Sequence, residues 1–155
     1  KFDNSVDGKL GLVVSVKPSS DGTIASPTST LTASDSGNIY MVDISANTAA
    51  FVLPSAPTAK GSVFTFILSI ESDAEGTKDL LIASGSATEY LMGAGIDGGV
   101  IHDQQSDDDQ IQIDTSAGAA GAGDRIKLLC DGNHWYVLDA SCLTASALVS
   151  GTASR

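Results

Sequence analysis

The sequence predicts an all-β protein: an antiparallel β-sandwich or a jelly-roll-like barrel of about ten short strands, with an extended N-terminal arm. Three observations predict it. Apolar residues alternate with polar ones in short runs, and Gly, Pro, Asp and Ser bound these runs. The runs recur roughly every 8 to 12 residues, the spacing typical of such folds. No segment has the 3.6-residue period of a long amphipathic helix. The 155 residues are enough for one ordinary domain.

Ten runs carry the strand pattern. They are residues 10–16, 28–33, 38–44, 49–53, 62–70, 79–83, 89–92, 110–114, 124–130 and 134–139. We therefore divide the chain into an N-terminal arm and linker (1–27), a β-sandwich body (28–140) and a C-terminal tail (141–155). The stretch 115–123 is so rich in Gly and Ala that we expect a loop there.

The first well-marked run is VFTFILSI, in which Phe64, Phe66, Leu68 and Ile70 share one face. Its other face is only half polar, so we expect a central strand, or one covered on both sides. In DQIQID (109–114) the alternation is clean, which is typical of an edge strand or of a strand with one wet face.

The strongest local signal is a C-terminal hairpin over residues 123–138. Either Asp131-Gly132 or Gly132-Asn133 can supply its tight turn. The two registers differ by two residues, so both place the same side chains inward. That inward set is Ile126, Leu128, Cys130, Trp135 and Val137.

The charge excludes several partners. Eight basic residues against nineteen acidic ones give a net charge of −11, so nucleic acid and anionic membrane surfaces would repel this chain. No apolar stretch is long enough to span a membrane, and residues 1–10 lack the apolar core of a signal peptide. We expect a soluble protein.

The two cysteines, Cys130 and Cys142, lie too far apart along the expected hairpin for a disulfide unless the C-terminal segment folds back. We favour two free thiols and assembly in a reducing compartment.

No motif predicts catalysis. Residues 93–98 match G-x-G-x-x-G, but no helical pattern follows to receive a dinucleotide, so we expect a glycine-rich turn between strands. The acidic stretch HDQQSDDDQ, with Asp103, Asp107, Asp108 and Asp109, fits no fixed calcium loop. We expect it to be solvated. His102 and His134 lie in no zinc-binding spacing. We expect neither an enzyme nor a cofactor.

A series of turn and core residues carries a resemblance over about residues 28–140. These are Leu31-Thr32, Gly37-Asn38-Ile39-Tyr40, Leu53-Pro54, Gly61 with Phe64 and Phe66, Gly123-Asp124, Asp131-Gly132 and Trp135-Tyr136-Val137. In these marks the chain resembles a small β-module of tailed-phage virion proteins. That module occurs in capsid decoration (cement) proteins and in some tail-fibre or appendage domains. The acidic stretch and the tail depart from it.

The resemblance implies a structural virion protein on the outer surface of an icosahedral head, assembled in the host cytoplasm. It implies a homotrimer at local three-fold positions, with the major capsid protein as partner. The arm LGLVVSV can add to a sheet edge on a capsid subunit or on a neighbouring copy. We therefore expect Leu10, Leu12, Val13, Val14 and Val16 to contact the capsid, and deletion of residues 1–17 to abolish binding to heads while the body stays folded.

Two other classes stay open. One is a receptor-binding or adhesive domain of a tail fibre or appendage, whose loops would meet a glycan or protein of the host. Low aromatic content, 5% with a single Trp assigned to the core, gives carbohydrate binding little support. The other is a hydrolase on a β scaffold, which lacks every motif considered above.

Overall fold

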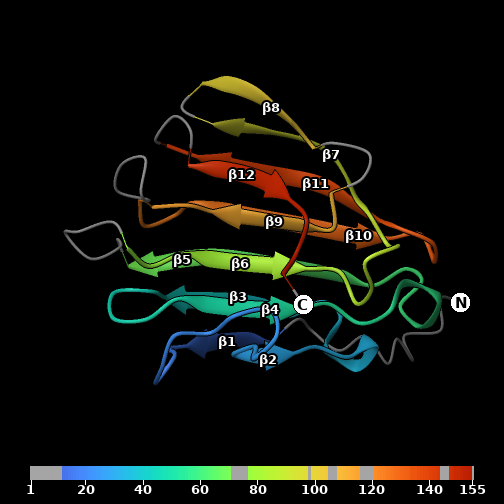
Figure 1. Cartoon of the computed structure of the whole chain (residues 1–155), viewed down its shortest axis with the longest axis horizontal. Helices are drawn as coiled ribbons and strands as arrows, with labels where there is room; N and C mark the ends of the chain where they lie inside the picture. The colour runs from blue at the N-terminus through green and yellow to red at the C-terminus, as the bar shows by residue number, and fades with distance from the viewer. Residues whose placement is uncertain are drawn as a thin grey trace, which may run out of the picture.

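The computed structural model describes residues 12–70, 77–97, 99–104, 108–115, 121–143 and 147–154. These residues form twelve strands in two mixed sheets and two short 3₁₀ turns, η1 (Ala33–Asp35) and η2 (Ala56–Thr58). The all-β class is therefore confirmed. Figure 1 shows the sheets one behind the other, so that β3 overlaps β4 and β5 overlaps β6. None of the described segments is a helix capable of crossing a membrane.

The larger sheet has seven strands. In spatial order they are β1 (Val13–Val16), β3 (Ile39–Asp43), β5 (Val63–Ile70), β10 (Arg125–Cys130), β11 (Trp135–Cys142), β7 (Leu91–Asp97) and β8 (Val100–Gln104). The smaller sheet has five strands. They are β12 (Leu148–Gly151), β9 (Gln110–Ile113), β6 (Leu80–Ala83), β4 (Ala49–Val52) and β2 (Ser29–Thr30).

The first six strands wind as a coil, which the sequence did not predict. Odd-numbered strands enter the seven-stranded sheet and even-numbered strands enter the five-stranded sheet. Within each sheet they pair in parallel: β1 with β3, β3 with β5, β2 with β4, and β4 with β6. The expectation of an antiparallel arrangement is wrong here. The alternation of apolar residues shows which face of a strand points inward. A strand with parallel neighbours and one with antiparallel neighbours have the same alternation, so the pattern does not reveal the direction of the neighbour.

The remaining strands are mostly antiparallel. The β10–β11 hairpin turns at Gly132-Asn133, closed by the bond from the Asp131 N–H to the His134 carbonyl, which decides between the two expected registers. β7 is the exception, because it pairs in parallel with β11. The two sheets do not close into a barrel, and the jelly-roll-like alternative is not confirmed.

One hydrophobic core lies between the sheets. It joins Phe64 and Phe66 of the seven-stranded sheet to Phe51, Ile82 and their neighbours on the five-stranded sheet. The rings of Phe51 and Phe66 lie 5.0 Å apart across the two layers. β5 is a central strand, as expected, and its inward residues Phe64, Phe66 and Leu68 are buried. Of the expected inward set of the hairpin, all but Val137 are fully buried, and Val137 is partly buried against the same core.

A second, smaller cluster covers part of the outer face of the five-stranded sheet. Ile24 from the linker and Ala153 from the tail pack with Ala50 and Ala83, whose side chains point outward from β4 and β6. The Asp21 carboxylate fixes the linker by accepting the backbone N–H of Thr48. The linker and the tail are thus packed segments of the fold.

The chain ends contribute strands that differ from the expected arm and tail. β1 is the outermost strand of the seven-stranded sheet, and Val14 and Val16 pack against the core. β12, near the C-terminal end of the chain, pairs with β9, so β9 is not an edge strand. The outer face of β9 is polar, as expected. Cys130 and Cys142 are both buried, and no disulfide joins them in the structure. Burial raises the pKa of the Cys130 thiol.

Candidate functional site: the outer face of the seven-stranded sheet

The two outer faces of the molecule differ in what covers them. Among the described residues, no second layer packs on the outer face of the seven-stranded sheet. This face is substantially apolar. One cross-strand row is formed by Val63, Leu129, Tyr136 and Met92, which the registers of β5, β10, β11 and β7 place side by side. All four side chains are half-buried.

A second row crosses the same face from its outer edge. It runs from Val13 through Ile39, Thr65 and Lys127 to Asp139. Leu12 and Val13, at the edge, are 64% and 59% exposed. Large apolar side chains on an uncovered face are typical of a surface that binds another macromolecule.

A bulge in β11 shapes the far side of this face. Between the pairs Val137↔Gly93 and Ser141↔Ile96, β11 has one more residue than β7. The same strand also shifts register against β10, between Lys127 and Leu128. A shallow groove of about 330 Å³ results, and the lining residues are Ala94, Gly95, Ile96, Leu138, Asp139 and Ala140. Ile96 and Leu138 flank it and are more than half exposed.

Among the described side chains of this face, most charges are paired. The Arg125 Nε lies 2.6 Å from a carboxylate oxygen of Asp139, and Lys17 lies 2.9 Å from Asp43 at the opposite side. Adding Lys127 leaves this set of charges at +1, in a chain whose total is −11. The described charges of this face are therefore less acidic than the composition of the chain as a whole.

The predicted arm residues lie at one border of this face. Leu10 lies outside the described residues. Leu12 and Val13 are exposed, whereas Val14 and Val16 point toward the core. Because β1 pairs with β3 over all four of its residues, it is a strand of this chain's own sheet. Deleting residues 1–17 would therefore uncover β3 and part of the core, which makes it a poor test of binding.

The acidic stretch is not simply solvated. Asp108 and Asp109 are buried, and Asp109 accepts the backbone N–H of Ala153. The backbone of Asp109 also bonds with Ser84 and Gly151, so this residue joins the ends of three strands. The Asp103 side chain and Asp107 lie outside the described residues. Among those described, no three His, Cys, Asp or Glu side chains are grouped closely enough to hold a metal ion.

Many of the chain's carboxylates have a structural use that the composition alone did not reveal. Eight of them accept a backbone N–H at a loop or turn. They are Asp21 (from Thr48), Asp35 (Thr32), Asp43 (Ser45), Asp79 (Thr115), Glu89 (Ala56), Asp109 (Ala153), Asp124 (Gly121 and Leu143) and Asp131 (Asn133 and His134). The Ser45 hydroxyl and the Lys17 ammonium lower the pKa of Asp43 to about 2.

The glycine motif and the histidines take structural positions. Residues 93–97 are part of β7, where a turn had been expected, and Gly98 lies outside the described residues. The Gly95 backbone packs so closely that an added Cβ would lie 2.4 Å from Leu148. His102 belongs to β8, and its side chain lies outside the description. The His134 ring stacks on Tyr90 at 5.4 Å, and its Nδ1 accepts the Tyr90 N–H.

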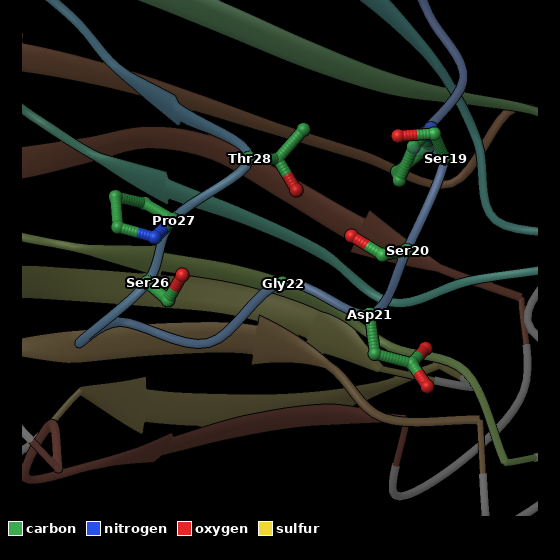
Figure 2. A pocket seen from close by; sticks show the side chains of 8 residues that line it. Ser19, Ser20, Asp21, Gly22, Ser26, Pro27 and Thr28 are labelled. Carbon is green, nitrogen blue, oxygen red and sulfur yellow. The ribbon is translucent and has the colours of Figure 1, made fainter.

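A polar hollow of about 200 Å³ lies within the linker. Figure 2 shows the linker doubling back, with Ser19, Ser20 and Asp21 on its first segment and Ser26, Pro27 and Thr28 on its second segment. The Asp21 carboxylate, which also pairs with Lys78, points away from the second segment (Figure 2). The lining thus offers hydroxyl and backbone groups but no unpaired charge, so we do not assign a ligand site here.

Comparisons with protein-family models, with curated proteins and with solved structures each return no match. Sequence patterns could not identify Ile96 and Leu138 as site residues. The one available signal was the change of parity in WYVLDASC, where Trp135 and Val137 are followed by inward-facing Ala140 and Cys142. Such a change indicates a bulge.

Proposed function

We propose that this chain is a capsid decoration protein of a tailed phage, which binds the outer surface of the head and stabilises the shell. The observation that supports the proposal is the contrast between the two outer faces. The linker and the tail pack on one, whereas no described segment covers the apolar surface of the other. A molecule arranged in this way is suited to binding through one face. The resemblance described above supplies the partner, the major capsid protein.

The mechanism is mass action. A protein that binds the mature shell and not its unassembled subunits stabilises the shell by RT ln(1 + [L]/Kd) per site, with no bond made or broken. A specific interface buries roughly 800 Å² on each partner. The proposed homotrimer would make three linked contacts, which raises the effective concentration of the second and third. The exposed side chains of Leu12 and Val13 lie at the border of the binding face, so the arm contributes through them.

The binding face can be tested with a matched pair of substitutions. Thr65→Glu adds one negative charge at the centre of the proposed face, and Gln112→Glu adds the same charge on the outer face of the other sheet. Both side chains point outward and are half-buried. Glu at position 112 also keeps the acceptor that Gln110 uses. We expect Thr65→Glu to weaken binding to heads that lack this protein at least tenfold, about 1.4 kcal/mol, because a charge is buried in the contact.

The readout is a titration of purified heads with labelled protein. Gln112→Glu should saturate heads like the wild type. Equal affinity of the wild type and Thr65→Glu would overturn the assignment of this face. Failure of the wild-type protein itself to bind heads would overturn the decoration function.

A second candidate function, an adhesive domain on a tail fibre or appendage, is favoured by one observation. The hairpin end brings together three half-buried rings, because His134 stacks on Tyr90 and Tyr136 lies two residues further along. Aromatic side chains at a surface are what a carbohydrate site uses. Electron microscopy of labelled particles separates the two functions. Regular density over the head supports decoration, whereas density confined to the tail supports adhesion.

A further inference from the structure

The middle of the outer face of the seven-stranded sheet carries two cations. Arg125 and Lys127 lie two residues apart on β10, which is the fourth of the seven strands in spatial order. Residues two apart on a strand point to the same side of a sheet, so both side chains reach the outer face, and both are exposed. Thr65 and Asp139 flank Lys127 on the neighbouring strands. The two cations thus lie at the centre of the face that we propose binds the capsid.

A single carboxylate accompanies these two cations among the described residues. The Arg125 Nε lies 2.6 Å from a carboxylate oxygen of Asp139, and this bond uses one of the five N–H groups of the guanidinium. Lys127 lies opposite Asp139 in the register but forms no ion pair with any side chain that the structure describes. Arg125, Lys127 and Asp139, which we call the β10 cluster, therefore have two positive charges and one negative charge.

The surroundings of the β10 cluster are apolar. Val63 and Ile67 point outward from the neighbouring strand β5. Leu129 and Tyr136 form the next outward pair on β10 and β11. All four of these side chains are half-buried. A partner that covers this face therefore removes water from the Lys127 ammonium, and a buried charge without a counterion is strongly unfavourable.

The partner has to bring an acceptor for this ammonium. A backbone carbonyl accepts a hydrogen bond but leaves the positive charge uncompensated. A carboxylate supplies both the acceptor and the opposite charge, and such a bond is roughly twice as strong as one between neutral groups. The guanidinium of Arg125 has further N–H groups besides the Nε, so it can donate to the same carboxylate. An Asp or Glu side chain of the partner is thus the group that suits the β10 cluster best.

The net charge of −11 does not change this preference. Exposed charges more than about 8 Å apart are largely screened at physiological ionic strength, whereas a carboxylate seated on the β10 cluster is in direct contact with it. The distant acidic side chains slow the approach of an acidic partner, and the local ion pair stabilises the contact once it has formed. An apolar surface without a carboxylate at its centre would leave the cluster unpaired, so charge distinguishes between partners here.

We propose that the capsid subunit bound by this face places an Asp or Glu side chain against Lys127 and Arg125, at the centre of the contact. This inference rests on the proposed decoration function, because it concerns the same binding face. The apolar rows of the face can contact many surfaces, whereas the central ion pair selects one partner and fixes its position.

The test compares two substitutions at one position of the full chain. Lys127→Met removes the ammonium and keeps a flexible apolar side chain, whereas Lys127→Arg keeps a positive charge. Gln112→Glu is the control, because it makes the net charge more negative by the same amount on the outer face of the other sheet. Each labelled variant and the wild type are titrated against purified heads that lack this protein.

We expect Lys127→Met to bind heads at least about tenfold more weakly than the wild type, because the carboxylate of the partner is then buried without its counterion. Lys127→Arg should stay within about threefold of the wild type, since it keeps the charge, and Gln112→Glu should match the wild type. Wild-type affinity in Lys127→Met would overturn the inference. Equal losses in Lys127→Arg and Lys127→Met, or in Gln112→Glu and Lys127→Met, would also overturn it.

A second measurement identifies the acceptor on the shell. The carboxylates of purified heads are converted to neutral amides with a carbodiimide and excess glycinamide. The wild type and Lys127→Met should bind these heads equally, whereas a difference that stays at about tenfold would overturn a carboxylate as the partner group.

The two levels of the argument fail in different ways. If the wild type does not bind untreated heads, the decoration function and this inference both fall. If Thr65→Glu weakens binding and Lys127→Met does not, the binding face stands and the inference alone is overturned.

Discussion

The two halves of the chain build the same two sheets in different ways. In the first half (12–83), every strand crosses to the other sheet and the described pairs are parallel. In the second half (91–151), hairpins place consecutive strands side by side, and most pairs are antiparallel. Parallel neighbours require crossover connections, whereas a hairpin needs only a tight turn. The stability of the first half therefore depends more on the interactions that fix its crossover connections. The stability of the second half depends more on the backbone conformation of its turns.

The largest expected effect comes from the core that the coil of the first half encloses. The Phe66 ring lies 5.3 Å from Tyr40 and 5.0 Å from Phe51, so it joins two neighbouring strands and both sheets. Phe66→Ala should lower the free energy of unfolding by about 3 to 5 kcal/mol, because a fully buried aromatic side chain is removed. Urea denaturation at pH 7 measures the loss.

Thr65→Ala is the matched control for this substitution. Thr65 is the neighbouring residue on β5 and points to the outer face, so its truncation should cost less than about 1 kcal/mol. If Phe66→Ala is no more harmful than Thr65→Ala, the packing described between the two sheets is wrong.

A buried carboxylate connects the two halves and gives the next largest effect. Glu89 precedes β7 and accepts hydrogen bonds from the Ser55 hydroxyl at 2.7 Å and the Ala56 N–H at 2.9 Å. Glu89→Ala should cost about 1 to 3 kcal/mol, because the buried Ala56 N–H loses its acceptor. Hydrogen exchange at Ala56 should become faster than in the wild type.

Glu89→Gln separates the hydrogen bond from the charge. The amide keeps one acceptor oxygen and almost the same volume, so it should lose less stability than alanine does. Equal losses in the two variants would show that the negative charge matters more than the bond to η2. Unchanged exchange at Ala56 in both variants would argue against Glu89 as the acceptor.

Acid should destabilise the first half through Asp43, the last residue of β3. The Ser45 hydroxyl and then Lys17 lower the pKa of Asp43 from 3.8 to about 2. A carboxyl whose folded pKa is lowered stabilises the protein above its unfolded pKa, and this stability is lost as the pH falls from 3.8 toward 2. With its side chain 13% exposed, Asp43 contributes up to about 2 kcal/mol at pH 7.

Asp43→Asn should therefore be less stable than the wild type at pH 7, and the difference should shrink near pH 2. Urea midpoints at the two pH values measure it. Asp139→Asn is the control, because Asp139 forms an ion pair with Arg125 that is nearly half exposed on both sides and should contribute little. A constant gap between Asp43→Asn and the wild type at both pH values would contradict the role of this carboxylate.

How much the sequence could predict differs between the halves for a physical reason. Alternation identified all six strands of the first half, since burial on one face has period two whatever the neighbour. It could not identify the partner of β1 or β4, because that depends on connections of many residues. In the second half, Gly132 predicted the hairpin, but β8 and β12 were missed. β12 lies in a polar, serine-rich segment, and its Leu148 is buried because it faces the core between the sheets, next to Gly95 of β7.

The candidate site was less predictable than the fold. Leu12 and Val13 could be identified as arm residues, because an apolar run before a linker is visible in one dimension. Leu138 owes its exposure to a bulge against two neighbouring strands, and the change of parity in WYVLDASC indicates the bulge but not which residue it exposes. The carboxylates had appeared to be surface charge. Some of them find a backbone N–H partner only after distant loops meet, as Asp79 meets Thr115. Others, such as Asp35 and Asp43, accept from a residue two or three positions away.

The smallest expected effect compares one glycine from each half. Gly61 in the first half has φ +83°, with no atom within 4 Å of an added Cβ. Gly132 in the hairpin has φ +102°, and an added Cβ would lie 3.2 Å from the flexible Lys60 side chain. Substitution of either glycine by alanine should cost about 1 to 2 kcal/mol, because L-residues are strained at these angles. Thermal unfolding of both variants measures the two costs.

Similar costs would mean that turn chemistry is the same in both halves and that the difference between them lies in the crossovers. Gly132→Asn should lose less than Gly132→Ala, since Asn tolerates positive φ better. A neutral Gly132→Ala beside a costly Gly61→Ala would mean that the hairpin can adopt another turn. The antiparallel half would then depend on its cross-strand pairs more than on its turn residue, and the contrast between the halves would be weaker than the structure indicates.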